Sequence, residues 1–224
     1  MKKKSIFVWL FLFITLTTFY LDFNKTSFVK SFKLKQIEIN GVKNADINLI
    51  NLRLEYFKDQ NVFFIKQEEI ANAIINLDFI NKVGIKKIYP NKIKLQIEEY
   101  KIIAVIIDDL KKYVLGEDGN IIKKYTNNFD ALPMVYGQNT SSYFPEFYKF
   151  LKEINFKTEE VEHFKFFETN RWDVYLKNGK LIKLPEDKDK MRKSIKEFIS
   201  INKDEEFNKF KIFDFRVKNQ LIIK

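Results

Sequence analysis

The side chains that could do chemistry are few in this chain of 224 residues, and their spacing does not assemble a catalytic centre. The only histidine, His163, lies in the alternating segment VEHFKFF, which favours an ordinary position on the surface of a sheet. A single histidine cannot act both as the general base that activates a nucleophile and as a metal ligand. Glu98 and Glu99 are adjacent, and adjacent residues of a strand point to opposite faces. We therefore do not expect them to act as a carboxylate pair.

The other candidates for cofactor or metal binding have structural explanations. Gly116 and Gly119 lie in a turn between two short strands, without the following helix of a phosphate-binding loop. Asp187 and Asp189 stand where acidic residues help a helix to begin. The chain has no cysteine, which removes thiol nucleophiles, thiolate metal sites and disulfides. We expect no catalytic residue, no metal site and no cofactor.

The composition is that of a globular chain with a basic surface. It is 46% hydrophobic and 31% charged, with a formal net charge of +10. The lysines are interleaved with acidic residues, and there is no arginine-rich run, no RNA-binding aromatic motif and no helix-turn-helix signal. We expect neither a nucleic-acid partner nor a small-molecule substrate.

The N-terminus carries a membrane signal. Lys2–Lys4 precede an uncharged apolar run over 6–21, which as a helix spans roughly 24 Å against about 30 Å for a hydrocarbon core. A cleaved signal peptide and an uncleaved signal anchor both begin in this way. We favour the anchor, because bulky aromatic residues stand in the following segment TTFYLDFN, where a signal peptidase needs small side chains.

Positive charge at the start favours a cytoplasmic N-terminus, and a long downstream domain translocates largely regardless of its charge. We therefore expect residues 1–5 to be a short cytoplasmic tail, 6–21 a transmembrane anchor in contact with lipid, and 22–33 a polar linker. The anchor residues that we single out are Ile6, Trp9, Phe13, Leu16 and Leu21.

Residues 34–100 are predicted to form a small α+β unit. Alternation of apolar and polar residues predicts three strands: 34–39, 83–89 and 92–99. The last two are joined as a hairpin at Pro90-Asn91. Apolar residues at helical spacing predict one helix after a cap at Asn44–Asp46 and a second from about Gln67. This order of elements favours one small sheet with both helices on one face.

Residues 101–224 are predicted to form a mainly antiparallel β-domain with flanking helices. Short apolar or alternating segments predict strands over 102–107, 113–115, 121–123, 132–136, 161–167, 172–176, 180–184, 210–217 and 221–223. Turn residues at Gly116–Asn120 and Asn178-Gly179 indicate two hairpins. Helices are expected after Pro145 and over Met191–Ile199. Trp172 either packs in the core or meets a partner, and the sequence does not separate the two.

The order of these elements resembles a POTRA domain followed by a β-domain. The segments that carry the resemblance in the first unit are Ile37–Val42, Asn61–Ile65 and the hairpin Val83–Glu99. Those in the second unit are Tyr113–Gly119, Asn170–Val174 with Asn178-Gly179, and Phe213–Arg216. Together they resemble the FtsQ/DivIB family of bacterial division proteins over nearly the whole chain.

The resemblance implies a non-catalytic scaffold in the bacterial inner membrane at the division septum, with a cytoplasmic N-terminus and periplasmic C-terminal domains. Its β-domain would bind the small coiled-coil proteins FtsB and FtsL, whose strand adds to the last edge strand, about residues 211–223. Arg216 matches the family's Asp-x-Arg position, which is placed to meet a partner carboxylate. The residues implied at this edge are Phe213, Phe215, Arg216, Val217, Leu221, Ile222 and Ile223.

The resemblance also implies that the POTRA unit and the membrane helix recruit other division proteins, with Asn40 and Gly41 as the recruitment loop. The chain departs from the family pattern at Val217, where an aromatic residue is common, and at Asn219-Gln220, where a glycine often ends the turn.

Two other interpretations remain open from the sequence. A POTRA protein that handles outer-membrane or secreted polypeptides usually carries repeated POTRA units and a membrane β-barrel, whereas we find one unit behind an anchor. A membrane-anchored cell-wall enzyme would need convergent acids, or a nucleophile with its base, and we find neither.

Overall fold

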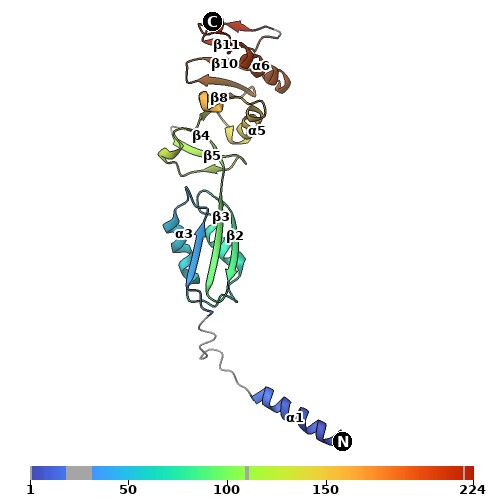
Figure 1. Cartoon of the computed structure of the whole chain (residues 1–224). Helices are drawn as coiled ribbons and strands as arrows, with labels where there is room; N and C mark the ends of the chain where they lie inside the picture. The colour runs from blue at the N-terminus through green and yellow to red at the C-terminus, as the bar shows by residue number, and fades with distance from the viewer. Residues whose placement is uncertain (1, 19–31, 109–110, 219) are drawn as a thin grey trace. The chain divides into compact units, whose positions relative to one another are not determined.

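The computed structural model describes residues 2–18, 32–108, 111–218 and 220–224 (Figure 1). The chain divides into two compact units, Met1–Glu99 and Tyr100–Lys224. The first helix, α1, spans Lys2–Thr18. Within the described residues, no helix has both the length and the apolar character needed to cross a membrane.

The first unit contains the strand, helix, helix, strand, strand order predicted from the sequence. Its elements are β1 (Gln36–Asn40), α3 (Ile47–Leu54), the 3-10 helix η1 (Glu55–Phe57), α4 (Gln67–Ile74), β2 (Ile80–Ile88) and β3 (Lys92–Glu99). The strand order is β1-β3-β2, with β1 parallel and β2 antiparallel to the central β3. The predicted fold of this unit is confirmed.

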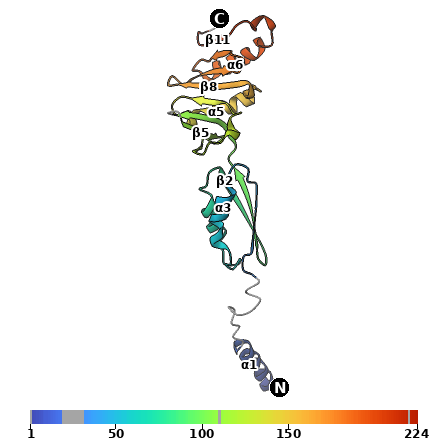
Figure 2. The ribbon, with the colours of Figure 1, turned by 90° about the vertical axis from the view of Figure 1, so that its left-hand side faces the viewer.

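Local signals and one buried face explain the packing of the first unit. The Asp46 side chain caps α3 by accepting hydrogen bonds from the backbone N–H groups of Asn48 and Leu49. Both helices lie on the same side of the strands in Figure 2. The side chains that fill the space between them are fully buried, and they include Ile50, Leu54, Ile70, Ile74, Ile93, Leu95 and Ile97.

The second unit is built on a nine-stranded sheet, counted over the described residues. Its strands are β4 (Ile102–Asp108), β5 (Lys111–Gly116), β6 (Ile121–Ile122), β7 (Met134–Tyr136), β8 (Val161–Phe167), β9 (Arg171–Leu176), β10 (Leu181–Lys183), β11 (Ile212–Asp214) and β12 (Ile222–Ile223). The helices are α5 (Thr140–Glu153) and α6 (Lys188–Ile201), with 3-10 turns η2 (Asn127–Phe129), η3 (Thr158–Glu160) and η4 (Glu205–Phe207). The spatial order is β12-β11-β10-β9-β8-β7-β4-β5-β6.

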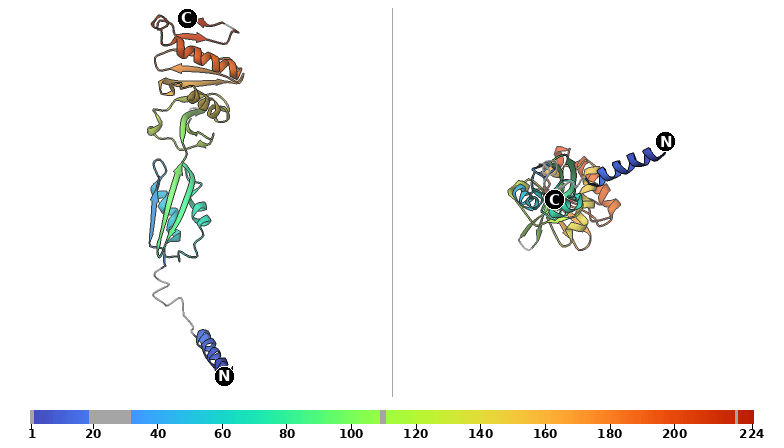
Figure 3. Two further views of the ribbon diagram at one scale, coloured as in Figure 1. Left: turned by 45° about the vertical axis from the view of Figure 1, so that its right-hand side comes forward. Right: turned by 90° about the horizontal axis from the view of Figure 1, so that it is seen from below.

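This sheet is mixed, which the prediction of a mainly antiparallel domain did not capture. Five of its eight pairings are antiparallel, and three are parallel: β4 with β7, β7 with β8, and β10 with β11. The last two arise because α5 connects β7 to β8 and α6 connects β10 to β11, and a helical crossover returns the chain in the same direction. Both helices lie on one side of the sheet (Figures 1 and 3).

An aromatic core fills the space between this sheet and its helices. Trp172 is stacked on Phe147 at 4.7 Å between ring centroids and also contacts Phe164 and Phe166. Of the two alternatives left open for Trp172, packing in the core or contact with a partner, the structure shows packing in the core. The predicted start of α5 after Pro145 is wrong, since the helix begins at Thr140. A proline near a helix start removes one N–H but does not prevent the turn before it.

Candidate functional site

The C-terminal end of the chain forms one edge of the nine-stranded sheet. β12 is the outermost strand and pairs only with β11 among the described residues, in antiparallel register with Ile223 opposite Phe213. The single edge strand implied by the resemblance, about residues 211–223, is thus two short strands, β11 and β12, as the separate predicted strands 210–217 and 221–223 indicate. Only the second of these strands presents a free edge.

The hydrogen-bond pattern defines which backbone groups of β12 face outward. Ile212 and Lys224 exchange both of their backbone hydrogen bonds, at 3.0 and 3.1 Å between nitrogen and oxygen. Bonded and non-bonded pairs alternate along an antiparallel ladder, so the N–H and C=O of Ile223 point away from β11. These two groups are the ones that an added strand would meet.

The structure separates the seven residues implied at this edge into buried and exposed groups. The Phe213 side chain is fully buried against Phe198, and Phe215 is also in the core. Val217 and Ile222 are 43% and 38% exposed. Leu221 and Ile223 are partly buried against the core cluster. Phe213 and Phe215 therefore hold β11 in place, and the exposed side chains belong to the loop and to β12.

Arg216 is engaged with its own chain. Its Nε and Nη2 atoms donate to the two carboxylate oxygens of Asp214 at 2.8 and 2.5 Å. The hydrogen bonds from Arg216 lower the pKa of Asp214 below its usual range, although partial burial opposes them. This two-point contact fixes the direction of the guanidinium, and Nη1, which has no hydrogen-bond partner among the described residues, is left for another acceptor.

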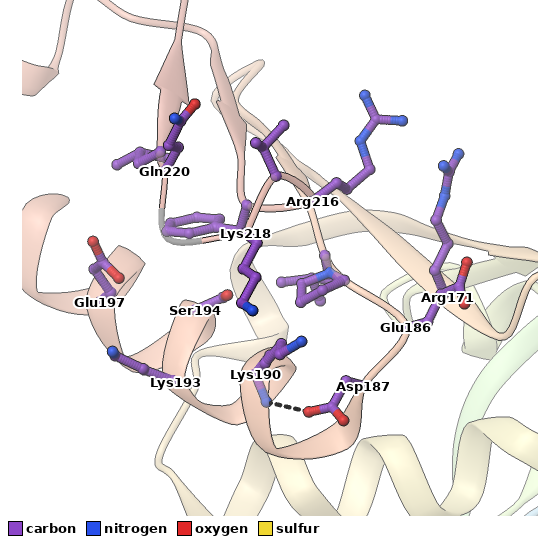
Figure 4. Close-up of a pocket in the computed structure, with 15 residues that line it drawn as sticks. Arg171, Glu186, Asp187, Lys190, Lys193, Ser194, Glu197, Arg216, Lys218 and Gln220 are labelled. Atoms are coloured by element: carbon purple, nitrogen blue, oxygen red, sulfur yellow. Dashed lines mark hydrogen bonds between the residues drawn. The ribbon is translucent and has the colours of Figure 1, made fainter.

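An open cleft of about 850 Å³ adjoins this edge (Figure 4). One wall is α6, with Lys193, Ser194 and Glu197, and another is formed by Phe215–Lys218 with Gln220 and Leu221. Figure 4 shows the side chains of Arg171 and Arg216 pointing in the same direction, on the side of the cleft remote from Lys193 and Glu197. The cleft thus lies between α6 and the residues that precede β12, and its lining ends at Leu221, next to that strand.

The charge of the cleft is mainly positive. Its basic side chains are Arg171, Lys190, Lys193, Arg216 and Lys218, and its acidic ones are Glu186, Asp187 and Glu197. Asp187 is used as the N-cap of α6, where its side chain accepts from the backbone N–H of Lys190, as expected from the sequence. Basic side chains thus outnumber acidic ones by two in the lining of the cleft, and one of the basic side chains, Arg216, is paired with Asp214.

The contribution of α6 and Arg171 to this site was not predicted from the sequence. The apolar spacing of α6 predicted its buried face, and the polar residues on the rest of the helix carry no separate signal. Arg171 reaches the same cleft only because the fold brings the start of β9 beside the loop after β11.

Of the predicted recruitment loop, Asn40 ends β1 and Gly41 follows it, and the residues just after Gly41 are held by Glu99 at the end of β3. The carboxylate of Glu99 accepts hydrogen bonds from the backbone N–H groups of Lys43, Asn44 and Ala45 at 2.7 to 3.0 Å. Burial alone raises the pKa of Glu99, but these hydrogen bonds outweigh it and the pKa is lowered. Gly41 has a φ of +87°, which an L side chain rarely adopts.

The residues first considered for chemistry are not brought together. His163 lies on β8, stacked on Tyr175 at 4.1 Å between ring centroids, and burial lowers its pKa. Glu98 pairs with Lys82, whereas Glu99 faces the loop after β1. In the part of the chain that the structure describes, no three His, Asp or Glu residues are grouped to hold a metal ion.

The predicted anchor residues fall in or just after α1. The side chains of Ile6, Trp9 and Phe13 are exposed. Leu16 also lies in α1, and Leu21 lies outside the described residues.

Comparisons with known proteins match both units. The family model described as "Cell division protein FtsQ/DivIB, C-terminal" matches residues 104–216, and that described as "POTRA domain, FtsQ-type" matches 32–100. The cell division protein FtsQ of Rickettsia conorii is 28% identical over 199 residues, which cover 86% of this chain and 72% of the relative. FtsQ of Agrobacterium fabrum is 21% identical over 164 residues, which cover 72% of this chain and 51% of the relative.

A solved structure of the major extracytoplasmic domain of DivIB from Geobacillus stearothermophilus covers 38% of this chain and 76% of its own, with 18% identity and a TM-score of 0.30. The family assignment rests on the sequence matches.

A POTRA unit followed by a mixed β-domain of this type defines a bacterial cell division protein. The chain belongs to the FtsQ/DivIB family, whose members are non-catalytic and act at the division septum. Membership implies partners within the division machinery.

Proposed function

We propose that this protein is a single-pass membrane scaffold that binds FtsB and FtsL through the edge strand β12 and links early to late division proteins. The observation that carries the proposal is the outward-facing backbone of Ile223 at a free sheet edge. Unpaired N–H and C=O groups at an edge accept a strand from another chain, and the alternating side chains of that strand give specificity.

The cleft beside β12 supports the same proposal. In this proposal, the segment next to the added strand lies in the cleft between α6 and the residues that precede β12. The five basic side chains of the cleft favour acidic residues in that segment. In this proposal the free Nη1 of Arg216 meets a partner carboxylate while Asp214 holds the guanidinium in place.

The membrane part of the proposal rests on the sequence of the first 21 residues. Residues 6–21 are the anchor, 1–5 the cytoplasmic tail and 22–33 the linker, with the POTRA domain (34–100) and β-domain (101–224) in the periplasm. The exposed apolar side chains of α1 are suited to contact with lipid. The Asn40-Gly41 loop is the proposed contact of the POTRA unit with other division proteins.

A proline substitution at Ile223 tests the edge directly. Ile223→Pro removes the outward-facing N–H, whereas the bonds between Ile212 and Lys224 stay in place. We expect the full-length variant to capture the FtsB–FtsL pair of the same organism at least tenfold less well than the unmodified chain. Ile223→Val is the matched control, because it keeps the N–H and a branched side chain, and it should capture normally.

Both variants carry Trp9→Phe, so that fluorescence of Trp172, which lies in the core of the β-domain, verifies that they are folded. Capture by folded Ile223→Pro at the level of Ile223→Val would place the partner site elsewhere on the protein.

A further inference from the structure

One end of the first unit exposes a cluster of aromatic side chains. Phe64, Phe63 and Tyr89 are 82%, 52% and 50% exposed. Phe63 is stacked on Tyr89 at 4.5 Å between ring centroids and lies 4.8 Å from the ring of Phe32. We call these four residues the aromatic end. Exposed aromatic side chains in contact with one another mark an interaction surface.

Backbone hydrogen bonds tie three separate segments together at the aromatic end. The N–H of Val62 donates to the carbonyl of Phe32, and the N–H of Leu34 donates to that of Gln60. The N–H of Lys35 donates to the carbonyl of Asn91, just after Tyr89 and before β3. The cluster is therefore part of the folded unit and is presented as a formed surface.

The same three segments are basic. Residues 32–35, 55–66 and 87–92 contain six lysines against two acidic residues. The lysines are Lys33, Lys35, Lys58, Lys66, Lys87 and Lys92, and the acidic residues are Glu55 and Asp59. The Lys87 ammonium donates to the carbonyl of Phe63 at 3.2 Å, which places it beside the aromatic rings. Aromatic rings bordered by lysines suit the headgroup region of a bilayer that contains anionic lipid.

The opposite end of the unit has a different character. It is formed by the loop after β1, the start of α3 and the residues between α4 and β2, where Phe79 is buried. Ile47, at the start of α3, is exposed there, and no exposed aromatic side chain occurs in 40–47 or 75–80, all of which the structure describes. The two ends are therefore chemically distinct, and only the aromatic end resembles a membrane-facing surface.

The length of the chain before Phe32 keeps the aromatic end within reach of a membrane. Residues 19–31 separate it from the last residue of α1 and span at most about 45 Å when extended. With α1 as the anchor, which is part of the proposed function, the chain enters the first unit at the end that carries the aromatic cluster. We propose that the aromatic end docks on the anionic headgroup surface of the bilayer that holds α1.

A single fluorescent label measures this docking. The chain has no cysteine, so Lys58→Cys gives one labelling site in the segment 55–66, which contributes Phe63 and Phe64 to the aromatic end. The full-length protein is reconstituted into nanodiscs that contain phosphatidylglycerol and a lipid-borne quencher. We expect quenching of the label at position 58 to be at least threefold stronger than quenching of a label introduced by Ile47→Cys at the opposite end.

A second substitution tests the role of the aromatic side chain. Phe64→Ser, added to Lys58→Cys, should reduce quenching to the level found at position 47, because Phe64 is exposed and its loss does not disturb the core. Leu49→Ser is the matched control, since Leu49 is an exposed apolar residue on α3, and it should leave quenching at position 58 unchanged. Equal effects of the two serine variants would overturn the proposal.

A third label separates failure of this inference from failure of the anchor. Phe11→Cys places the label on α1. Strong quenching at position 11 with equal, weak quenching at 58 and 47 would refute docking of the aromatic end and leave the anchor standing. Weak quenching at all three positions would refute the anchor and the docking together. Quenching at 58 that is unchanged in nanodiscs of phosphatidylcholine alone would overturn the contribution of the lysines.

Discussion

Glu99 is the residue that holds the loop after β1 in place. Glu99→Gln replaces a carboxylate that accepts three backbone N–H groups with an amide that has one acceptor oxygen. We expect the free energy of unfolding of the first unit to fall by about 1–3 kcal/mol at pH 7, measured by urea unfolding. Glu98→Gln is the control, because Glu98 is an exposed partner of Lys82 at 3.4 Å, and its loss should change stability by less than about 0.5 kcal/mol.

The effect of Glu99→Gln also has a defined dependence on pH. The folded-state pKa of Glu99 is lowered, so its stabilisation is present above the unfolded-state pKa and is lost as pH falls through the folded-state pKa. The difference between Glu99→Gln and the unmodified chain should therefore shrink on acidification below about pH 4. A difference that stays constant down to pH 3 would show that the loop is not held by the ionised carboxylate.

Asp173 is a carboxylate in an unfavourable position. It is 2% exposed, and its Oδ1 atom has no hydrogen-bond partner among the described residues. The nearest cation, Nε of Arg171, is 3.8 Å away, which is too far for a hydrogen bond. Burial raises the pKa of Asp173, and the attraction of Arg171, Lys183 and Arg216 offsets this only in part.

Asp173→Asn is therefore expected to increase the free energy of unfolding at pH 7. A raised folded-state pKa means that protonation favours the folded state, so the penalty of the ionised form grows as pH rises through that pKa. The gain in free energy of unfolding from Asp173→Asn should vanish as pH falls. Urea unfolding of the variant and of the unmodified chain between pH 7 and pH 3.5 measures this. Asp214→Asn provides the control of opposite sign, because the pKa of Asp214 is lowered and its loss should destabilise the fold at pH 7. If Asp173→Asn and Asp214→Asn changed the free energy of unfolding in the same direction at pH 7, this account would be contradicted.

The helices and strands with strong local signals were predicted well. The cap at Asp46 begins α3, α4 begins at Gln67 as expected, and β3 covers the predicted range 92–99. The start of α3 follows from its capping side chain, and those of α4 and β3 follow from the spacing of apolar residues, which a single sequence displays.

The elements that depend on tertiary context were predicted less well. The final segment is divided into β11 and β12 because Phe213 and Phe215 are drawn into the core, after which the chain turns back. Local patterns predicted separate strands over 210–217 and 221–223, but not that the first of them ends at Asp214. The start of α5 was missed because a proline was treated as a boundary.

The candidate surfaces also depend on tertiary contacts that local sequence patterns do not predict. The residues of β12 were identified from a resemblance, whereas the cleft joins Arg171, α6 and the loop after β11 through contacts that no spacing predicts. The aromatic end likewise depends on Phe32, Phe63 and Tyr89 meeting from three segments. Sequence patterns predict which face of an element is buried, and the fold determines which exposed residues become neighbours.

The molecule as a whole contains two units with separate cores. The large aromatic cluster lies entirely within the second unit and includes Trp172. Trp172 is therefore a reporter of the β-domain once the other tryptophan, Trp9, is replaced by Phe. Two reporters, total heat absorption and Trp172 fluorescence, can then distinguish unfolding of the whole chain from unfolding of the β-domain.

Gly41→Ala should destabilise the first unit and leave the second unchanged. Its φ is +87°, and a Cβ would lie 2.0 Å from the carbonyl oxygen of Ile97, so strain and overlap add. We expect a loss of at least about 1 kcal/mol, or a decrease of roughly 4–8 °C in the midpoint of a first calorimetric transition, with no shift in the Trp172 transition. Gly179→Ala is the reciprocal control, since its φ is +82° in the hairpin between β9 and β10 and no atom lies within 4 Å of the added Cβ. That variant should shift only the Trp172 transition, and a common shift of both transitions by either variant would show that the two units unfold as one.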